Sequence, residues 1–141
     1  MNIKIRKTNL YSKSPSYAHK GDAGLDLFSA VDINIKPKHR TAVPTGIEME
    51  IPEGYAGLIW DKSGMALQDG IKTMAGVVDS TYRGEIKVVI VNLSSKIIKI
   101  KNGDKVAQIL VQPITTANII DSDSLTHTKR GEKGFGSTGK H

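Results

Sequence analysis

The residues best suited to chemistry lie near the end of the printed chain, where residues 130–139 read RGEKGFGSTG. Glycines let backbone amides approach a phosphate closely, and the hydroxyls of Ser137 and Thr138 add hydrogen-bond donors. Phe135 has no apolar neighbours in this segment and is suited to stack on a nucleic-acid base. Two interpretations therefore stand with similar weight: a phosphate-binding segment and a solvated Gly/Ser terminus.

A second candidate is the acid in residues 76–86, GVVDSTYRGEI. Asp79 follows two β-branched apolar residues, so we expect its carboxylate at the rim of buried structure, where it can accept a proton from a water. The alternative is a turn aspartate that bonds its own backbone, which is the more frequent role at such positions. Tyr82 either presents its ring to a sugar or closes the hairpin.

Three further segments carry weaker signals. In residues 61–67, DKSGMAL, Lys62 and Ser63 open a short helical turn and form an anion site or, more simply, a serine cap. Asp26 lies between two leucines, either in a structural turn or as a carboxylate aimed at the water shell of a metal. Gln108 is an amide in an apolar strand and needs a partner from ligand or protein. The histidines have no metal-ligand spacing.

The elements that must position these residues are short strands. Short β-like runs at 3–6, 31–35, 47–51, 55–60, 85–93, 96–101 and 105–111 are separated by Gly, Pro, Asn and Asp. Only residues 63–68 favour a helical turn. The pattern predicts an all-β barrel or jelly roll over residues 1–120. From 121 to 141 the pattern dissolves, and we expect a mobile C-terminal arm that carries the glycine-rich segment.

The composition narrows the classes of function. The chain has 141 residues, no cysteine and a net charge of +6, which predicts one domain without disulfides and with a polyanionic partner. The basic residues are dispersed and aromatics make up only 5%, which disfavours a dedicated nucleic-acid surface. No stretch of membrane-spanning length is free of charge, so we expect a soluble, cytoplasmic protein without a membrane partner.

Taken in order, residues 22–27, 61–66, 76–86, 103–108 and 130–139 resemble the five motifs of the trimeric dUTPase family. The third and fifth are the most specific. The resemblance implies a β-clip or distorted jelly-roll subunit, a homotrimer with sites at subunit boundaries, and Mg²⁺ as cofactor. It implies a dUTP diphosphatase that hydrolyses dUTP to dUMP and pyrophosphate, which lowers the dUTP pool and supplies dUMP for thymidylate synthesis. A viral enzyme of this family would work inside its host cell.

The resemblance also implies a role for each motif. Asp79 activates the attacking water, and Asp26 contacts Mg²⁺ through water. Substrate binding falls to Lys62, Ser63, Gly64, Thr73, Gly76, Val77, Val78, Tyr82, Lys87, Gln108, Arg130, Phe135, Gly136, Ser137 and Thr138. Within this set the hairpin 73–82 reads uracil through backbone groups, and Tyr82 lies under the deoxyribose. Residues 62–64 and Gln108 contact phosphates, and Lys87 is a weaker phosphate candidate. Arg130 and Phe135 close the site, with Phe135 over the uracil and residues 136–138 near the γ-phosphate.

Two positions depart from the family pattern in the second motif. Lys62 stands where Arg is usual, which keeps the charge and loses the bidentate fork. Asp61 replaces the usual Pro or Gly and adds a negative charge that the sequence does not explain.

Three rival functions remain. A dCTP deaminase shares the fold and much of the motif order. Deaminases of this type carry an Arg and a Glu at the positions that Leu67 and Val89 occupy here, so this chain lacks an acid/base for the exocyclic amine. An inactive binding protein of the same fold has no chemical need for Asp79, Tyr82 and the intact tail together. A nucleic-acid binder is supported by net charge alone.

Overall fold

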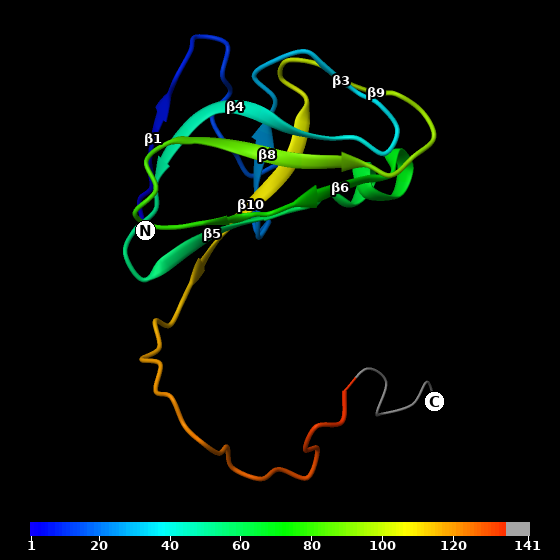
Figure 1. Ribbon diagram of the computed structural model, residues 1–141. Helices are drawn as coiled ribbons and strands as arrows, with labels where there is room; N and C mark the ends of the chain where they lie inside the picture. Colours follow the sequence, from blue (N-terminus) through cyan, green and yellow to red (C-terminus); the bar gives the residue numbers. More distant parts are fainter. Residues whose placement is uncertain (135–141) are drawn as a thin grey trace.

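A computed structural model describes residues 1–134, in which short antiparallel strands dominate, as the sequence predicts. One four-stranded sheet has the order β1-β4-β8-β6, a second has the order β2-β10-β5-β7, and β3 pairs with β9 (Figure 1). The strand bounds are β1 (Lys4–Lys7), β2 (Leu25–Phe28), β3 (Ile33–Ile35), β4 (Arg40–Glu50), β5 (Tyr55–Trp60), β6 (Ile71–Met74), β7 (Val77–Val78), β8 (Glu85–Asn92), β9 (Ile98–Ile100) and β10 (Lys105–Pro113).

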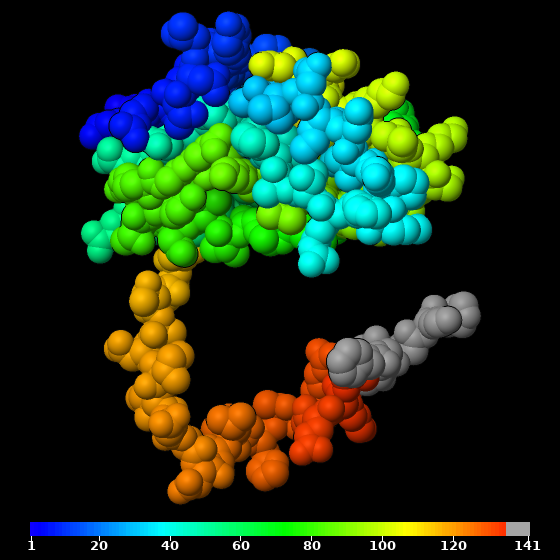
Figure 2. Space-filling view, turned by 45° about the horizontal axis from the view of Figure 1, so that its top comes forward, coloured from blue at the N-terminus to red at the C-terminus, as the bar shows by residue number. Residues whose placement is uncertain are grey.

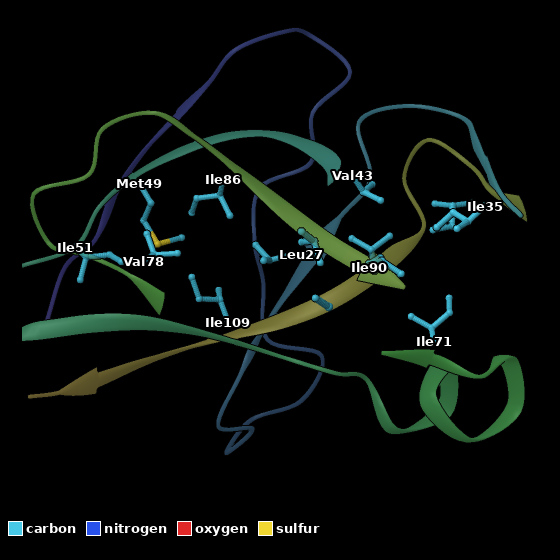
Figure 3. Close-up of a cluster of buried hydrophobic side chains, with 14 residues drawn as sticks. Leu27, Ile35, Val43, Met49, Ile51, Ile71, Val78, Ile86, Ile90 and Ile109 are labelled. Carbon is cyan, nitrogen blue, oxygen red and sulfur yellow. The ribbon is translucent and has the colours of Figure 1, made fainter. Parts of the chain in front are cut away.

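The hydrophobic core lies between the two larger sheets. Alternate residues of β8 are buried, because a strand with one face on the core points every second side chain inward. Ile86 and Ile90 of β8 face Leu27 of β2 and Ile109 of β10 across this core (Figure 3). The packed sheets form the rigid frame on which the candidate site residues stand.

Four strands differ from the sequence prediction. The run expected at 47–51 is part of the longer strand β4, which begins at Arg40. This strand continues through Pro44 because the β4–β8 register shifts there, and a strand tolerates proline at such an irregularity. The strands β2, β6 and β7, of two to four residues, were not predicted from the sequence.

The expected helical turn follows β5 as the short π-helix η1 (Met65–Asp69), preceded by helical residues 63–64. It ends at Gly70, whose φ of 69° is the left-handed conformation typical of a helix C-cap. Ser63 is itself the first helical residue, and no side chain forms a capping hydrogen bond at this end. The serine-cap interpretation of Ser63 is therefore wrong, and its hydroxyl stays available.

Beyond β10 the described chain leaves the sheets. Residues 114–134 contain no strand or helix and are exposed throughout, and they run away from the folded body (Figures 1 and 2). Within the part of the chain that the structure describes, no helix has the length and apolar character needed to cross a membrane.

Candidate functional site

Three of the five motifs meet on neighbouring strands of one sheet. Gln108 of β10 lies opposite Asp26 of β2 on one side and opposite Trp60 of β5 on the other. The loop 61–64 begins directly after Trp60, so it starts beside Gln108 and Asp26. Strand register thus assembles residues that are far apart in sequence.

The first motif provides a buried, ionised carboxylate. Asp26 is only 3% exposed, and it forms ion pairs with Lys62 at Oδ1 and with Lys105, whose Nζ lies 2.6 Å from Oδ2. Burial raises the pKa of Asp26, but the bonds to Lys105 and Lys62 outweigh it and hold the pKa below its ordinary value. Lys62 is expected to bind phosphates, but in the isolated chain it forms an ion pair with Asp26.

Gln108 has a protein partner in this structure. Its Nε2 donates a hydrogen bond of 2.9 Å to the carbonyl oxygen of Asp61. Gly24 makes room for this amide, because a Cβ at position 24 would lie 2.5 Å from Gln108 Oε1. The first motif therefore leaves space for the fourth, which explains a glycine at position 24.

The unexplained Asp61 has three polar partners on β6. Its Oδ1 accepts hydrogen bonds from Thr73 N at 2.5 Å and Thr73 Oγ1 at 2.7 Å, and its Oδ2 accepts one from Lys72 Nζ at 2.6 Å. Burial raises the pKa of Asp61, while the Lys72 and Thr73 bonds lower it by more, so the net shift is downward. Thr73, expected at the start of the uracil hairpin, is 6% exposed and held by this carboxylate.

The segment expected as the uracil hairpin turns between β6 and β7 through two residues with positive φ, and these strands pair with β8 and β5 rather than with each other. Ala75 has a φ of 58° and Gly76 a φ of 135°. A Cβ at Gly76 would lie 2.9 Å from the carbonyl oxygen of Ile59, so only glycine fits. Ile59 N donates a 2.8 Å bond to Gly76 O, which fastens the hairpin to β5. Strained backbone of this kind clusters at functional sites.

Asp79 lies directly after β7, in a pocket of about 330 Å³. Tyr82 and Lys87 line the same pocket, together with Gly76, Val77 and Val78. The Asp79 side chain is exposed, and only its backbone carbonyl is engaged, by Tyr82 N at 3.1 Å, among the bonds of the described residues. Within the described residues the carboxylate itself forms no hydrogen bond or ion pair with another protein group.

Tyr82 closes the hairpin in the isolated chain. Its Oη donates a 3.0 Å hydrogen bond to the carbonyl oxygen of Glu85, and 46% of the residue remains exposed. This contact fits the closing role considered from the sequence, and the exposed ring leaves the sugar-facing role open. Lys87 lies on β8 and lines the same pocket as Tyr82, with its Nζ 3.8 Å from Glu85 Oε2.

The candidate residues form two separate groups within the described chain. Those that line the Asp79 pocket come from 59, 75–79, 82 and 85–87, so Lys62, Ser63 and Gln108 lie outside it. A larger hollow of about 720 Å³ lies between η1 and residues 94–100, and it includes neither Asp79 nor the hairpin. This hollow is therefore separate from the Asp79 pocket.

The fifth motif is described only in part. Arg130 Nε donates a 2.9 Å bond to the carbonyl oxygen of Lys133, within an exposed turn. Phe135, Gly136, Ser137 and Thr138 lie outside the described residues.

Sequence reasoning missed two contributors. Lys105 stood inside the fourth motif without a role, although a lysine beside an expected metal-facing acid was a signal for an ion pair. The charge of Asp61 was noticed, but its partners on β6 could not be deduced from local sequence.

The described residues contain no group of three or more His, Cys, Asp or Glu side chains that could hold a metal. Mg²⁺ keeps waters and binds phosphate oxygens with few protein ligands. Asp26 is the buried ionised acceptor nearest to Lys62.

Known proteins similar to this chain share one description. The dUTPase family model matches residues 11–139. The chain is 42% identical over 141 residues to a deoxyuridine 5'-triphosphate nucleotidohydrolase of Clostridium novyi, covering 99% of each chain. It is 43% identical over 142 residues to one of Nautilia profundicola, covering 99% of this chain and all of the relative.

Solved structures agree with this. A variant of the Staphylococcus bacteriophage 80alpha dUTPase with dUpNHpp superimposes with a TM-score of 0.90 at 26% identity, over 98% of both chains. A variant of the phage phi11 dUTPase, described with a structural Mg(II) ion, gives a TM-score of 0.81 at 25% identity, over 88% of this chain and 98% of that one. With a family match over nearly the whole chain and the motifs placed as described, this protein belongs to the dUTPase family.

Proposed function

We propose that this protein is a dUTP diphosphatase that hydrolyses dUTP to dUMP and pyrophosphate, and so removes dUTP while it supplies dUMP. The observation that carries the proposal is the free, exposed carboxylate of Asp79 in a pocket that it shares with Tyr82 and Lys87. Family membership makes a nucleoside triphosphate the substrate class. Hydrolysis then needs a positioned water, a base for its proton, and charge neutralisation at the phosphates.

Asp79 is the general base in this proposal. A carboxylate without a competing protein partner keeps its lone pairs for the water that attacks the phosphorus. Tyr82 forms the floor of the sugar site, where its exposed ring packs against C2′ and leaves no room for a ribose hydroxyl. The backbone of residues 73–82 reads the uracil edge, and the close approach of Gly76 to Ile59 makes that hairpin tight.

Lys62, Ser63, Gly64 and Gln108 bind the phosphates. Ser63 and Gly64 are exposed at the start of the helical turn, so their polar groups are available to an anion. Lys62 must turn from Asp26 toward the triphosphate. Its side chain is 27% exposed, and Lys105 still pairs with the buried carboxylate of Asp26 when Lys62 leaves. When bound, Mg²⁺ supplies further positive charge to the phosphates, and Asp26 would contact it through water. Lys87 is a secondary phosphate contact.

The C-terminal arm closes the site. Arg130 and Ser137 and Thr138 add charge and hydroxyl donors at the phosphates, the amide of Gly136 adds a donor, and Phe135 stacks on the uracil. Division of the chain into a core at 1–120 and an arm at 121–141 remains our working boundary, while the last strand ends at Pro113.

We further propose a homotrimer, because the two groups of site residues lie apart in one chain. Exposed apolar side chains on the arm support this, since Ile119, Ile120 and Leu125 are 86–90% exposed in the isolated chain. Light scattering of active enzyme should give three times the subunit mass of 15.3 kDa. An active monomer would disprove it.

Turnover of dUTP by purified protein tests the function. We expect stoichiometric pyrophosphate and dUMP without ammonia. Ammonia from dCTP would instead favour a deaminase, although Val89, opposite Ala42 and Met74 in the sheet, offers no acid for that reaction. Binding of dUpNHpp without turnover of dUTP would indicate an inactive binding protein.

A further inference from the structure

Asp61 links two parts of the molecule that the proposed function requires to act together. It follows the last residue of β5 and opens the phosphate loop 61–64. Its carboxylate bonds Thr73 and Lys72 on β6, which belongs to the other four-stranded sheet. A single side chain therefore ties the start of the loop to the strand that leads into the uracil hairpin.

The carboxylate makes two bonds to one residue, which fixes direction as well as distance. Thr73 donates through both its backbone N–H, at 2.5 Å, and its hydroxyl, at 2.7 Å. Thr73 is buried and precedes the strained turn at Ala75 and Gly76 by only a short span of strand. Because β8 holds β6 in register, Thr73 is a fixed point, and the bonds from Asp61 set the position of the loop 61–64 relative to the strand that leads into the turn.

The backbone of Asp61 has a second role. Its carbonyl oxygen is the acceptor for Gln108 Nε2 at 2.9 Å, and this bond orients the amide proposed to contact phosphate. Carbonyl and carboxylate belong to one residue, so the orientation of Gln108 depends on where the Thr73 bonds hold Asp61. The half-buried carboxylate stays ionised in this position, paired with Lys72.

We propose that Asp61 is a positioning residue, which holds the phosphate-binding loop and the uracil hairpin in a fixed relation so that one nucleotide can engage both. The inference rests on the proposed function and extends it to a residue outside the family pattern. Asp61 touches neither substrate nor reacting atoms. It acts through Thr73 on the base side and through Gln108 on the phosphate side.

The experiment compares Asp61→Ala and Asp61→Asn with the parent enzyme in dUpNHpp binding by calorimetry, kcat and KM for dUTP, and thermal melting. Misplacement of binding groups by about 1 Å can cost about 10²-fold, so Asp61→Ala should lose about 10–100-fold in dUpNHpp affinity and in kcat/KM. Asp61→Asn keeps an acceptor for Thr73 but turns an amide toward Lys72, so its loss should be about 3–10-fold.

Asp32→Ala is the matched control. Asp32 also accepts a backbone N–H, from Asn102 at 2.7 Å, and pairs with a lysine, Lys101 at 3.1 Å, but it lies on the β3–β9 side of the molecule and outside the site. Its dUpNHpp affinity should stay within about twofold of the parent, whatever its stability. If Asp61 served stability alone, Asp61→Ala and Asp32→Ala would both lower the melting temperature, and the two variants would bind dUpNHpp with similar affinity.

Coupling to Gln108 gives a readout that a stabilising role would not move. In Asp61→Ala/Gln108→Ala the loss of dUpNHpp affinity should be smaller than the product of the single losses, because Gln108 has already lost its orientation. Multiplicative losses, or Asp61→Ala affinity within twofold of the parent, would overturn the inference. If Asp61→Ala does not fold, an Asp61→Asn affinity within twofold of the parent decides against it. A parent that binds dUpNHpp but shows no Asp61 effect refutes only this inference, whereas a parent that neither binds dUpNHpp nor hydrolyses dUTP refutes both it and the proposed function.

Discussion

Three acids of the candidate site, Asp26, Asp61 and Asp79, fall into two regions with opposite arrangements. Asp26 and Asp61 are largely withdrawn from water and bonded to lysines or to Thr73, and their pKa values lie below the ordinary range. Asp79 is exposed at the end of the short strand β7, and the described residues leave its carboxylate free. We call the bonded carboxylates of Asp26 and Asp61 committed and the unbonded carboxylate of Asp79 free. A committed carboxylate can hold other groups in position, whereas a free one can accept a proton.

The sharpest way to break this comparison is Asp79→Asn. The amide cannot accept the proton of the attacking water, so kcat should fall by about 10²–10⁴-fold or more. Affinity for dUpNHpp should remain within a few-fold, because the shape of the pocket is kept. Pre-steady-state pyrophosphate release and calorimetry measure the two effects, with Asp32→Asn as a control acid far from the pocket. Turnover by Asp79→Asn close to the parent rate would remove Asp79 as the base.

Removal of residues 130–141 tests whether the free acid needs a covered site. The truncation leaves all strands intact, since β10 ends at Pro113, so the melting temperature without nucleotide should change by less than about 2 °C. Stacking by Phe135 is worth about 1–3 kcal/mol, and charge-assisted bonds add to it, so kcat should drop about 10²-fold. Full activity of the truncated enzyme would mean that the tail is only a solvated terminus.

Tyr82→Ala sharpens the description of the free region. Without the ring, a ribose 2′-hydroxyl fits, so the ratio of kcat/KM for dUTP over UTP should narrow about 10-fold. Tyr82→Phe is the matched control, because it keeps the ring and loses only the bond from Oη to the Glu85 carbonyl. An unchanged ratio in Tyr82→Ala would place the tyrosine outside the sugar site.

The committed region should respond in stability rather than in chemistry alone. Asp26→Asn removes charge from two ion pairs, and we expect the free energy of unfolding at pH 7 to fall by about 1–2 kcal/mol, limited by the partial exposure of both lysines. The folded pKa of Asp26 is depressed, so its contribution is full above the unfolded pKa and is lost as pH falls through the folded pKa.

Denaturant titrations of parent and Asp26→Asn from pH 7 down to pH 3 measure this. The difference between the two proteins should shrink at the acid end, once the pH lies below about 4, the ordinary value for an aspartate. A difference that stays constant with pH would show that the ion pairs add nothing to stability.

Sequence reasoning placed much of the fold correctly. The strand at 55–60 matches β5, and the strong run at 85–93 matches the central β8. In β8 a period of two over eight residues reports a half-buried strand directly. It placed the turn at Ser63 but offered a serine cap that the structure does not show, since capping depends on backbone angles that local composition does not specify. The strands β2, β6 and β7, which the sequence did not predict, are held by pairing with β10, β8 and β5.

For the site, the sequence supplied residue types and order. The acid at 79, the tyrosine at 82 and the glycine-rich tail follow from motif spacing, and so does the family. Spacing says which residues occur together along the chain, and chemistry says what such residues can do. Both are local properties, readable without coordinates.

Only the tertiary structure decided which of these residues are free and which are committed. Asp61 bonds a residue 12 positions away and Lys62 one 36 positions away, through strands brought together by the sheets. Such pairings depend on register and on the approach of two sheets, because a side chain finds its partner in space rather than along the chain. The sequence by itself thus determined the chemistry available to this protein, and the packing of the sheets decided which carboxylate remains available to perform it.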